Sequence, residues 1–104
     1  MTLSELHTTL SAVLPDKVVY NAWPVGEAPP LPFICYLVTG SSNFIADGEV
    51  YQPINAVAVE LYCKQKDPAA EALVETALRG IPWDKTETYL DDEHCIEIIY
   101  EIEV

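Results

Sequence analysis

The chain has 104 residues and a formal net charge of −12, from 17 Asp and Glu against only five Lys and Arg. This length suits one domain and is too short for two domains with separate cores, so we expect a single domain over residues 1–104. Half of the residues are apolar, which favours a folded core over disorder. Binding to nucleic acid or to an anionic membrane needs clustered cations, and the five here are scattered, so the sequence disfavours both.

The sequence also disfavours secretion, a membrane span and a zinc site. The N-terminus lacks the cationic start and continuous apolar run of a secretory signal. No apolar stretch approaches the ~20 residues that a membrane span needs. The cysteines Cys35, Cys63 and Cys95 are far apart and lie inside apolar runs, as is typical of reduced core thiols in a cytosolic protein. None of them belongs to a C-x-x-C pair, the usual half of a structural zinc site.

The first part of the chain predicts one helix and two strands. A T-x-x-E capping box at Thr2 and leucines at helical spacing predict a helix over residues 2–14. A short strand is expected at residues 18–20. The proline-rich stretch at residues 24–32 is expected to be an ordered, extended approach to the strand that follows. That strand, residues 33–38, is apolar on both alternating faces, which is typical of a central strand.

Residues 40–53 predict an extended arm or hairpin. The residues from Gly40 to Asn43 are of the kinds that form turns. Asp47-Gly48 is a dipeptide favoured in tight hairpins, and it divides an otherwise extended segment over residues 44–51. A loop of the same composition that folds over its own core is the alternative for this segment.

The second half of the chain predicts strand, helix, strand, strand. Residues 54–63 alternate as a strand does. Asp67 followed by proline is a strong helix start, and Gly80 ends that helix. Extended segments are expected at residues 83–89 and 94–104, joined by an acidic turn. The side chains expected to face the core are Val57, Val59, Leu61 and Cys63 on the first strand and Ile96, Ile98, Tyr100, Ile102 and Val104 on the last.

This order of elements predicts an α+β fold. Two helices would pack on one face of a mainly antiparallel sheet of about four to five strands, which gives two layers. The sequence shows no internal repeat.

Few residues in the chain have the spacing that catalysis requires. His7 and His94 have no Ser, Cys or metal-ligand partner nearby in the sequence, so neither is expected to be a general base. The acidic cluster from Asp91 to His94 does not have the ligand spacing of a calcium loop, so an exposed turn is favoured over a weak Ca²⁺ or Mg²⁺ site. The four glycines are too dispersed to form a phosphate-binding loop. We therefore expect neither enzyme activity nor a cofactor.

Over nearly its whole length the chain follows, with small departures, a pattern of five short motifs: P-Y/F-I-x-Y, an arm motif S-N-N-F-x-A-D-x-x-V-Y, V/I-E-L-Y, K-K-D-P and Y-x-K-T-E-x-Y. In this pattern the chain resembles a family of small bacteriophage and prophage proteins from the head–tail gene region. The chain departs from the pattern at Ser41-Ser42 and at Gln65. The matching residues are Pro32, Phe33, Ile34 and Tyr36; Ser42, Asn43, Phe44, Ala46, Asp47, Val50 and Tyr51; Val59, Glu60, Leu61 and Tyr62; Lys66, Asp67 and Pro68; and Lys85, Thr86, Glu87 and Tyr89.

The resemblance implies a tail-terminator or tail-completion role in a long-tailed phage. Such subunits form a ring, usually a hexamer, that caps the tail tube and joins it to the head connector. The protein would then be in the host cytoplasm during assembly and at the head–tail junction of the virion. An extended arm can reach a neighbouring subunit, and an acidic inner wall would let DNA pass without sticking. The candidate subunit-interface residues are Phe44, Ile45, Asp47, Val50 and Tyr51.

Two other functions remain open from the sequence. A head-closure adaptor is also a small structural protein of the same junction. An acidic module that mimics DNA and occupies the basic cleft of another protein would account for the net charge of −12.

Overall fold

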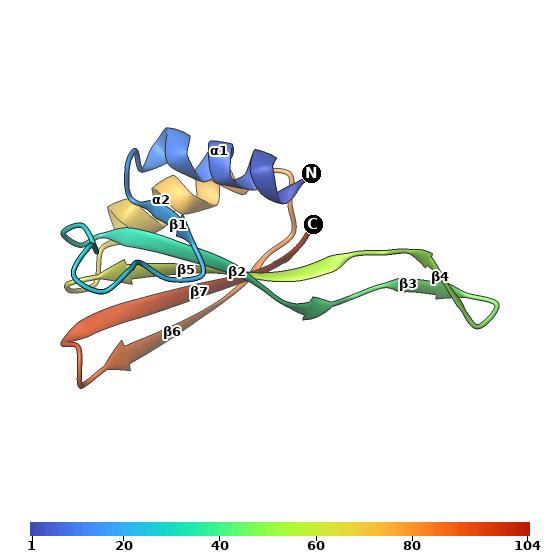
Figure 1. Ribbon diagram of the computed structural model, residues 1–104. Coiled ribbons are helices and arrows are strands. Elements are labelled where there is room, and N and C mark those ends of the chain that lie inside the picture. Colours follow the sequence, from blue (N-terminus) through green and yellow to red (C-terminus); the bar gives the residue numbers. More distant parts are fainter.

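A computed structural model of residues 1–104 shows a two-layer molecule with a projecting arm (Figure 1). The body is a five-stranded sheet with the strand order β1-β2-β5-β7-β6. Strand β1 runs parallel to β2, and the other neighbours are antiparallel. In chain order the elements are α1 (Leu3–Val13), β1 (Val18–Tyr20), β2 (Phe33–Ser41), β3 (Phe44–Ala46), β4 (Glu49–Gln52), β5 (Asn55–Cys63), α2 (Pro68–Ala77), β6 (Asp84–Leu90) and β7 (Cys95–Glu103).

Both helices cover the same face of the sheet (Figure 1). The predicted α+β class, with a mainly antiparallel sheet and two helices on one face, is therefore confirmed. Neither helix is long and apolar enough to cross a membrane.

Each helix begins where its capping residues predict. The Thr2 hydroxyl accepts a hydrogen bond from the Glu5 N–H (3.1 Å), and the Glu5 carboxylate accepts one from the Thr2 N–H (2.9 Å). Hydrogen bonds to the Glu5 carboxylate from the Thr2 backbone N–H, and then from the Thr2 side chain, lower the pKa of Glu5. At the start of α2, Asp67 accepts a hydrogen bond from the Ala70 N–H (3.1 Å) and Pro68 is the first helical residue. Both caps satisfy N–H groups that have no partner inside the helix.

The core lies between the helices and the sheet. Leu6 and Leu10 of α1 and Val74 of α2 are completely or almost completely buried, as is Tyr100 in β7. The alternation predicted for β5 and β7 is confirmed, because the same side chains form or border this core. The core residues contributed by these two strands are Val57, Val59, Leu61, Cys63, Ile98, Tyr100 and Ile102, with Ile96 and Val104 packed against them.

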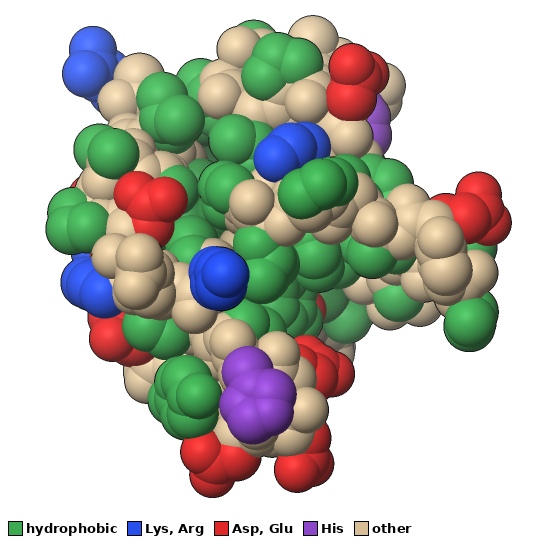
Figure 2. Space-filling view, turned by 90° about the vertical axis from the view of Figure 1, so that its left-hand side faces the viewer, with side chains coloured by type: hydrophobic (Ala, Val, Ile, Leu, Met, Phe, Trp, Pro, Cys, Tyr) green, Lys and Arg blue, Asp and Glu red, His purple; other side chains and the backbone are tan.

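The opposite face of the sheet carries no helix and is acidic. Residues that alternate with the core positions face this side. No Lys or Arg occupies a strand position on this face. The one cation within a strand is Lys85 of β6, and it lies on the core side because its cross-strand partner, Tyr100 of β7, faces the core. The carboxylates on it are Glu60, Asp84, Glu97, Glu101 and Glu103. Figure 2 shows further acidic side chains around the β6–β7 turn at the bottom of that view, with the Lys and Arg side chains above them.

The start of the arm corrects one expectation. Residues 40–43 were expected to turn, but β2 continues through Gly40 and Ser41, which pair with Ala56 and Asn55 of β5. The register shifts between Val38 and Gly40, so a bulge absorbs the irregular sequence and the ladder resumes beyond it. Long-range pairing with β5 thus outweighs the local turn preference.

Candidate interaction site: the β3–β4 arm

The arm is the outer half of one long hairpin. Its inner half is formed by β2 and β5, which pair in the body of the sheet. Beyond residues 42–43 on one side and 53–54 on the other, the same two chain segments pair again as β3 and β4. The arm leaves the body at one end of the sheet, and the molecule measures 48 Å along its longest axis against 28 and 26 Å in the other directions (Figure 1). The alternative of a loop folded over its own core is therefore wrong.

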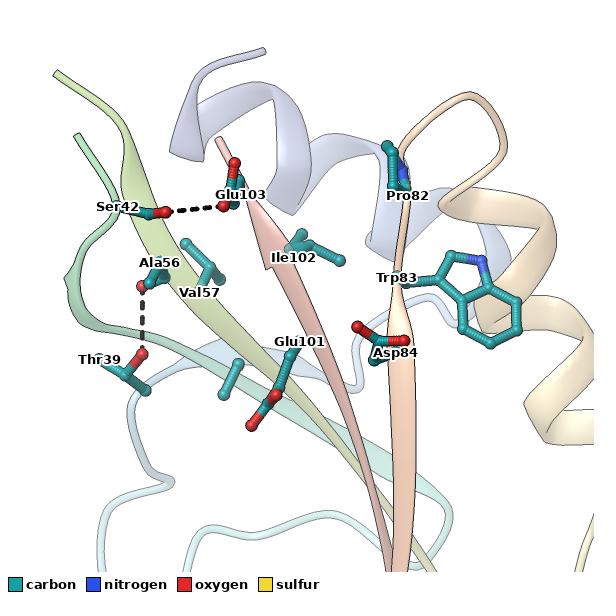
Figure 3. A pocket seen from close by; sticks show the side chains of 11 residues that line it. Thr39, Ser42, Ala56, Val57, Pro82, Trp83, Asp84, Glu101, Ile102 and Glu103 are labelled. Carbon is teal, nitrogen blue, oxygen red and sulfur yellow. Dashed lines mark hydrogen bonds between the residues drawn. The ribbon is translucent and has the colours of Figure 1, made fainter. Parts of the chain in front are cut away.

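Hydrogen bonds at its base attach the arm to the sheet. Ser42 donates its backbone N–H to the Ile54 carbonyl (2.8 Å) and its hydroxyl to Glu103 Oε1 (2.7 Å). The Ile54 N–H donates to the side-chain oxygen of Asn43 (3.0 Å). Figure 3 shows the bond between Ser42 and Glu103, which connects the base of the arm to the end of β7.

The tip of the arm is the predicted Asp47-Gly48 turn. Both residues have positive φ, 53° at Asp47 and 77° at Gly48. Two such residues in a two-residue loop match the right-handed twist of the flanking strands. The turn chemistry in the sequence therefore placed the tip correctly.

Four of the five candidate interface residues are large apolar side chains that remain exposed. Phe44 is 57% exposed, Ile45 63%, Val50 53% and Tyr51 75%. Ile45 and Val50 are direct cross-strand partners, while Phe44 and Tyr51 pack edge to face with ring centroids 5.9 Å apart. Asp47, the fifth candidate, is exposed at the turn.

A two-stranded ribbon of this kind is marginally stable alone, because it has no layer to pack against. Exposed apolar side chains gathered in one place are typical of surfaces that bind another molecule. The geometry of the arm therefore fits an interaction element whose apolar residues are buried in an assembly.

A groove lies beside the base of the arm (Figure 3). It has a volume of about 720 Å³, with the small side chains of Ala56 and Ala58 between Thr39 on one side and Glu101 on the other. Ser42 in this groove is bonded to a carboxylate, but no histidine lines the groove to serve as its general base.

The two histidines lie elsewhere and differ in their surroundings. His7 Nδ1 is 3.1 Å from the Tyr36 hydroxyl, a partner that sequence reasoning missed because it is 29 residues away. Tyr20 packs edge to face on Tyr36, and burial raises the pKa of Tyr36. His94 is exposed in the turn before β7. No group of three or more His, Cys, Asp or Glu side chains is arranged to hold a metal ion, so the Asp91–His94 cluster gains no support as a site.

No protein-family model and no curated protein matches this sequence. The features of the chain that point to a function are the arm, the distribution of charge and the sequence pattern described above.

Proposed function

We propose that this protein is a structural subunit of a long-tailed bacteriophage, a tail-terminator or tail-completion protein. It forms a homo-oligomeric ring, a hexamer, that caps the tail tube and joins it to the head connector. It assembles in the host cytoplasm and becomes part of the virion at the head–tail junction. It acts through protein contacts and needs no cofactor.

The observation that carries this proposal is the exposure of the arm. The most distinctive motif of the sequence resemblance, residues 42–51, coincides with the segment that leaves the body and exposes Phe44, Ile45, Val50 and Tyr51. Apolar residues at such positions contribute nothing to the core of their own chain. They are explained if each arm is buried against another subunit, as heterologous contacts in a ring require.

The charge distribution fits the same proposal. A ring at the head–tail junction must let DNA through, and an acidic surface repels phosphate. The helix-free face, with Glu60, Glu97 and Glu101 and no strand cation, offers such a surface. A head-closure adaptor would use the same features, and it differs only in the partner that it contacts.

The helix-free face also supports one alternative, an acidic module that binds a basic cleft in another protein. Such a module would bind through the sheet face and would not need the apolar arm. Substitutions in the arm therefore separate the two functions.

The test is deletion of the coding sequence from a phage that encodes it, followed by electron microscopy of the lysate. We expect separate heads and tails, or tails of abnormal length, and restoration by the wild-type chain. A chain with Ile45→Ser and Val50→Ser should fail to restore joining. The matched control is Leu73→Ser, since Leu73 is also an exposed apolar residue but lies on α2. Joined, infectious particles from the deletion strain would contradict the proposal.

A further inference from the structure

A second apolar site lies at the end of the molecule opposite the arm. There β2 begins, β5 ends and β7 begins, on the helix-free face and under the loop of residues 21–32. Together they enclose a hollow of about 380 Å³. Seven of its eight lining residues are hydrophobic, and Glu93 is the one charged member. The lining residues include Trp23, Leu31, Phe33, Cys35, Tyr62 and Cys95.

Aromatic rings form the wall of this hollow without closing it. Trp23 packs edge to face on Phe33, with centroids 6.1 Å apart, and Phe33 packs on Tyr62 at 5.3 Å. All three side chains remain partly exposed. The buried indole N–H of Trp23 has no hydrogen-bond acceptor in the chain. A buried donor without an acceptor is unfavourable.

The geometry points to one occupant for the hollow, the β3–β4 arm of a second copy of this chain. This inference builds on the proposed function, since it names the acceptor for the arm of the ring subunit. The arm supplies exposed Phe44, Ile45, Val50 and Tyr51, and the hollow supplies an apolar surface of matching character. The outer edges of β3 and β4 also carry unpaired backbone N–H and carbonyl groups, as edge strands that pair with another chain do.

The arm cannot fill the hollow of its own chain. The two sites lie at opposite ends of the sheet in a molecule 48 Å long, and the arm points away from the body (Figure 1). Figure 2 views the molecule from the hollow end and shows hydrophobic side chains at the surface there. The contact must therefore join two copies.

The contact joins two different patches and is therefore heterologous. Repeated with a rotation that closes, it produces a ring in which every arm and every hollow is occupied. Both cations and carboxylates lie at the hollow end. Lys17, which donates to the Pro30 carbonyl of the loop (3.0 Å), and Lys64 have the opposite charge to Asp47 and Glu49 of the arm, whereas Glu93 in the lining has the same charge.

Photo-crosslinking of the full-length chain tests this inference. Burial raises the pKa of Cys35 to about 11, so thiol chemistry at neutral pH would be slow there, and a light-activated group avoids this problem. Benzoylphenylalanine is placed at Tyr51, the purified protein is irradiated, and the joined peptides are identified by mass spectrometry. We expect crosslinks between copies, from position 51 to the peptides that contain Trp23–Cys35, Tyr62 or Cys95.

Two further proteins make the result decisive. Benzoylphenylalanine at exposed Leu73 should give no crosslink to the hollow. Leu31→Glu, which puts a charge into the hollow, should lower the yield from position 51 by at least about tenfold while the circular dichroism spectrum is unchanged. Crosslinks that map elsewhere, no crosslink between copies, or a yield that Leu31→Glu does not change would each overturn the inference.

The outcomes also separate this inference from the proposed function. If arm variants block tail joining but position 51 does not crosslink to the hollow, the arm binds the tail tube or connector and only this inference fails. If the crosslink forms but the deletion strain produces joined, infectious particles, the arm–hollow contact stands and the tail role fails.

Discussion

The Lys85 ammonium lies 3.1 Å from Glu71 Oε1, and this ion pair connects the edge strand β6 to helix α2. The Glu71 side chain is only 5% exposed, and its other oxygen is 2.8 Å from Lys66 Nζ. Lys85 also binds Glu75 (2.8 Å), which in turn accepts a hydrogen bond from the buried Tyr100 hydroxyl (2.8 Å). Two of the five cations, Lys66 and Lys85, are thus paired with carboxylates of α2.

Neutralising Glu71 should destabilise the protein. Glu71→Gln keeps the shape of the side chain but removes the charge that both Lys66 and Lys85 bind in a buried position. We expect the free energy of unfolding to fall by about 1–3 kcal/mol, measured by urea denaturation. The control is Glu87→Gln, because Glu87 pairs with Lys66 where both side chains are about half exposed, and it should cost less than about 1 kcal/mol. Equal losses would show that burial of Glu71 does not matter.

The same ion pairs should make the stability of the protein fall at low pH. Burial would raise the pKa of Glu71, but hydrogen bonds from Lys66 and Lys85 outweigh it and hold that pKa below 4.5. Lys85 and then Tyr100 lower the pKa of Glu75 in the same way. Their contribution to stability is therefore complete above about pH 4.5 and is lost as the pH falls through the lowered values. Melting temperatures from neutral pH down to about pH 3 should fall less steeply for Glu75→Gln than for the wild type.

The pKa of Glu60 is shifted in the opposite direction, so its effect on stability should have the opposite pH dependence. Burial on the helix-free face, and then the charge of Glu97, raise its pKa above 4.5, although a hydrogen bond from Tyr62 (3.0 Å) partly opposes this. A raised pKa contributes stability that is present below the unfolded value and is lost as the pH rises through the folded value. Glu60→Gln keeps an acceptor for Tyr62 and should stabilise the protein at neutral pH by up to about 1 kcal/mol.

The advantage of Glu60→Gln should disappear below about pH 4.5, where the wild-type carboxyl is protonated as well. Glu101→Gln, an exposed change on the same face, controls for the loss of one negative charge. A gain as large in Glu101→Gln would assign the effect to net charge and not to the burial of Glu60.

Replacing Gly48 with alanine should destabilise the arm, whereas the matched replacement of Gly40 should not. Gly48 has a φ of +77°, which an alanine adopts only with strain, so Gly48→Ala should destabilise the arm by about 1 kcal/mol. Gly40 has no positive φ, and nothing lies within 4 Å of an added Cβ there. Amide hydrogen exchange in β3 and β4 should therefore become faster in Gly48→Ala but not in Gly40→Ala. The global melting temperature of both variants should be nearly unchanged. Faster exchange throughout the sheet would show that the arm and body unfold as one unit.

Tertiary structure alone explains the features that connect distant segments. The sequence shows Glu71 as an ordinary helical glutamate, and only the folded structure brings Lys85 of β6 to it. The folded structure likewise brings His7 within hydrogen-bond distance of Tyr36. The hollow is a further case, because Trp23, Tyr62 and Cys95 come from three separate regions of the chain.

Both helix starts, the Asp47-Gly48 turn and the core faces of β5 and β7 could be predicted from the amino-acid sequence. Each depends on residues within a few positions of one another, through capping, backbone preference and strand alternation. Tertiary structure decided that β2 continues through Ser41, and that the arm points away from the body. These outcomes follow from hydrogen bonds and burial between residues far apart in the chain, and no local preference specifies those partners.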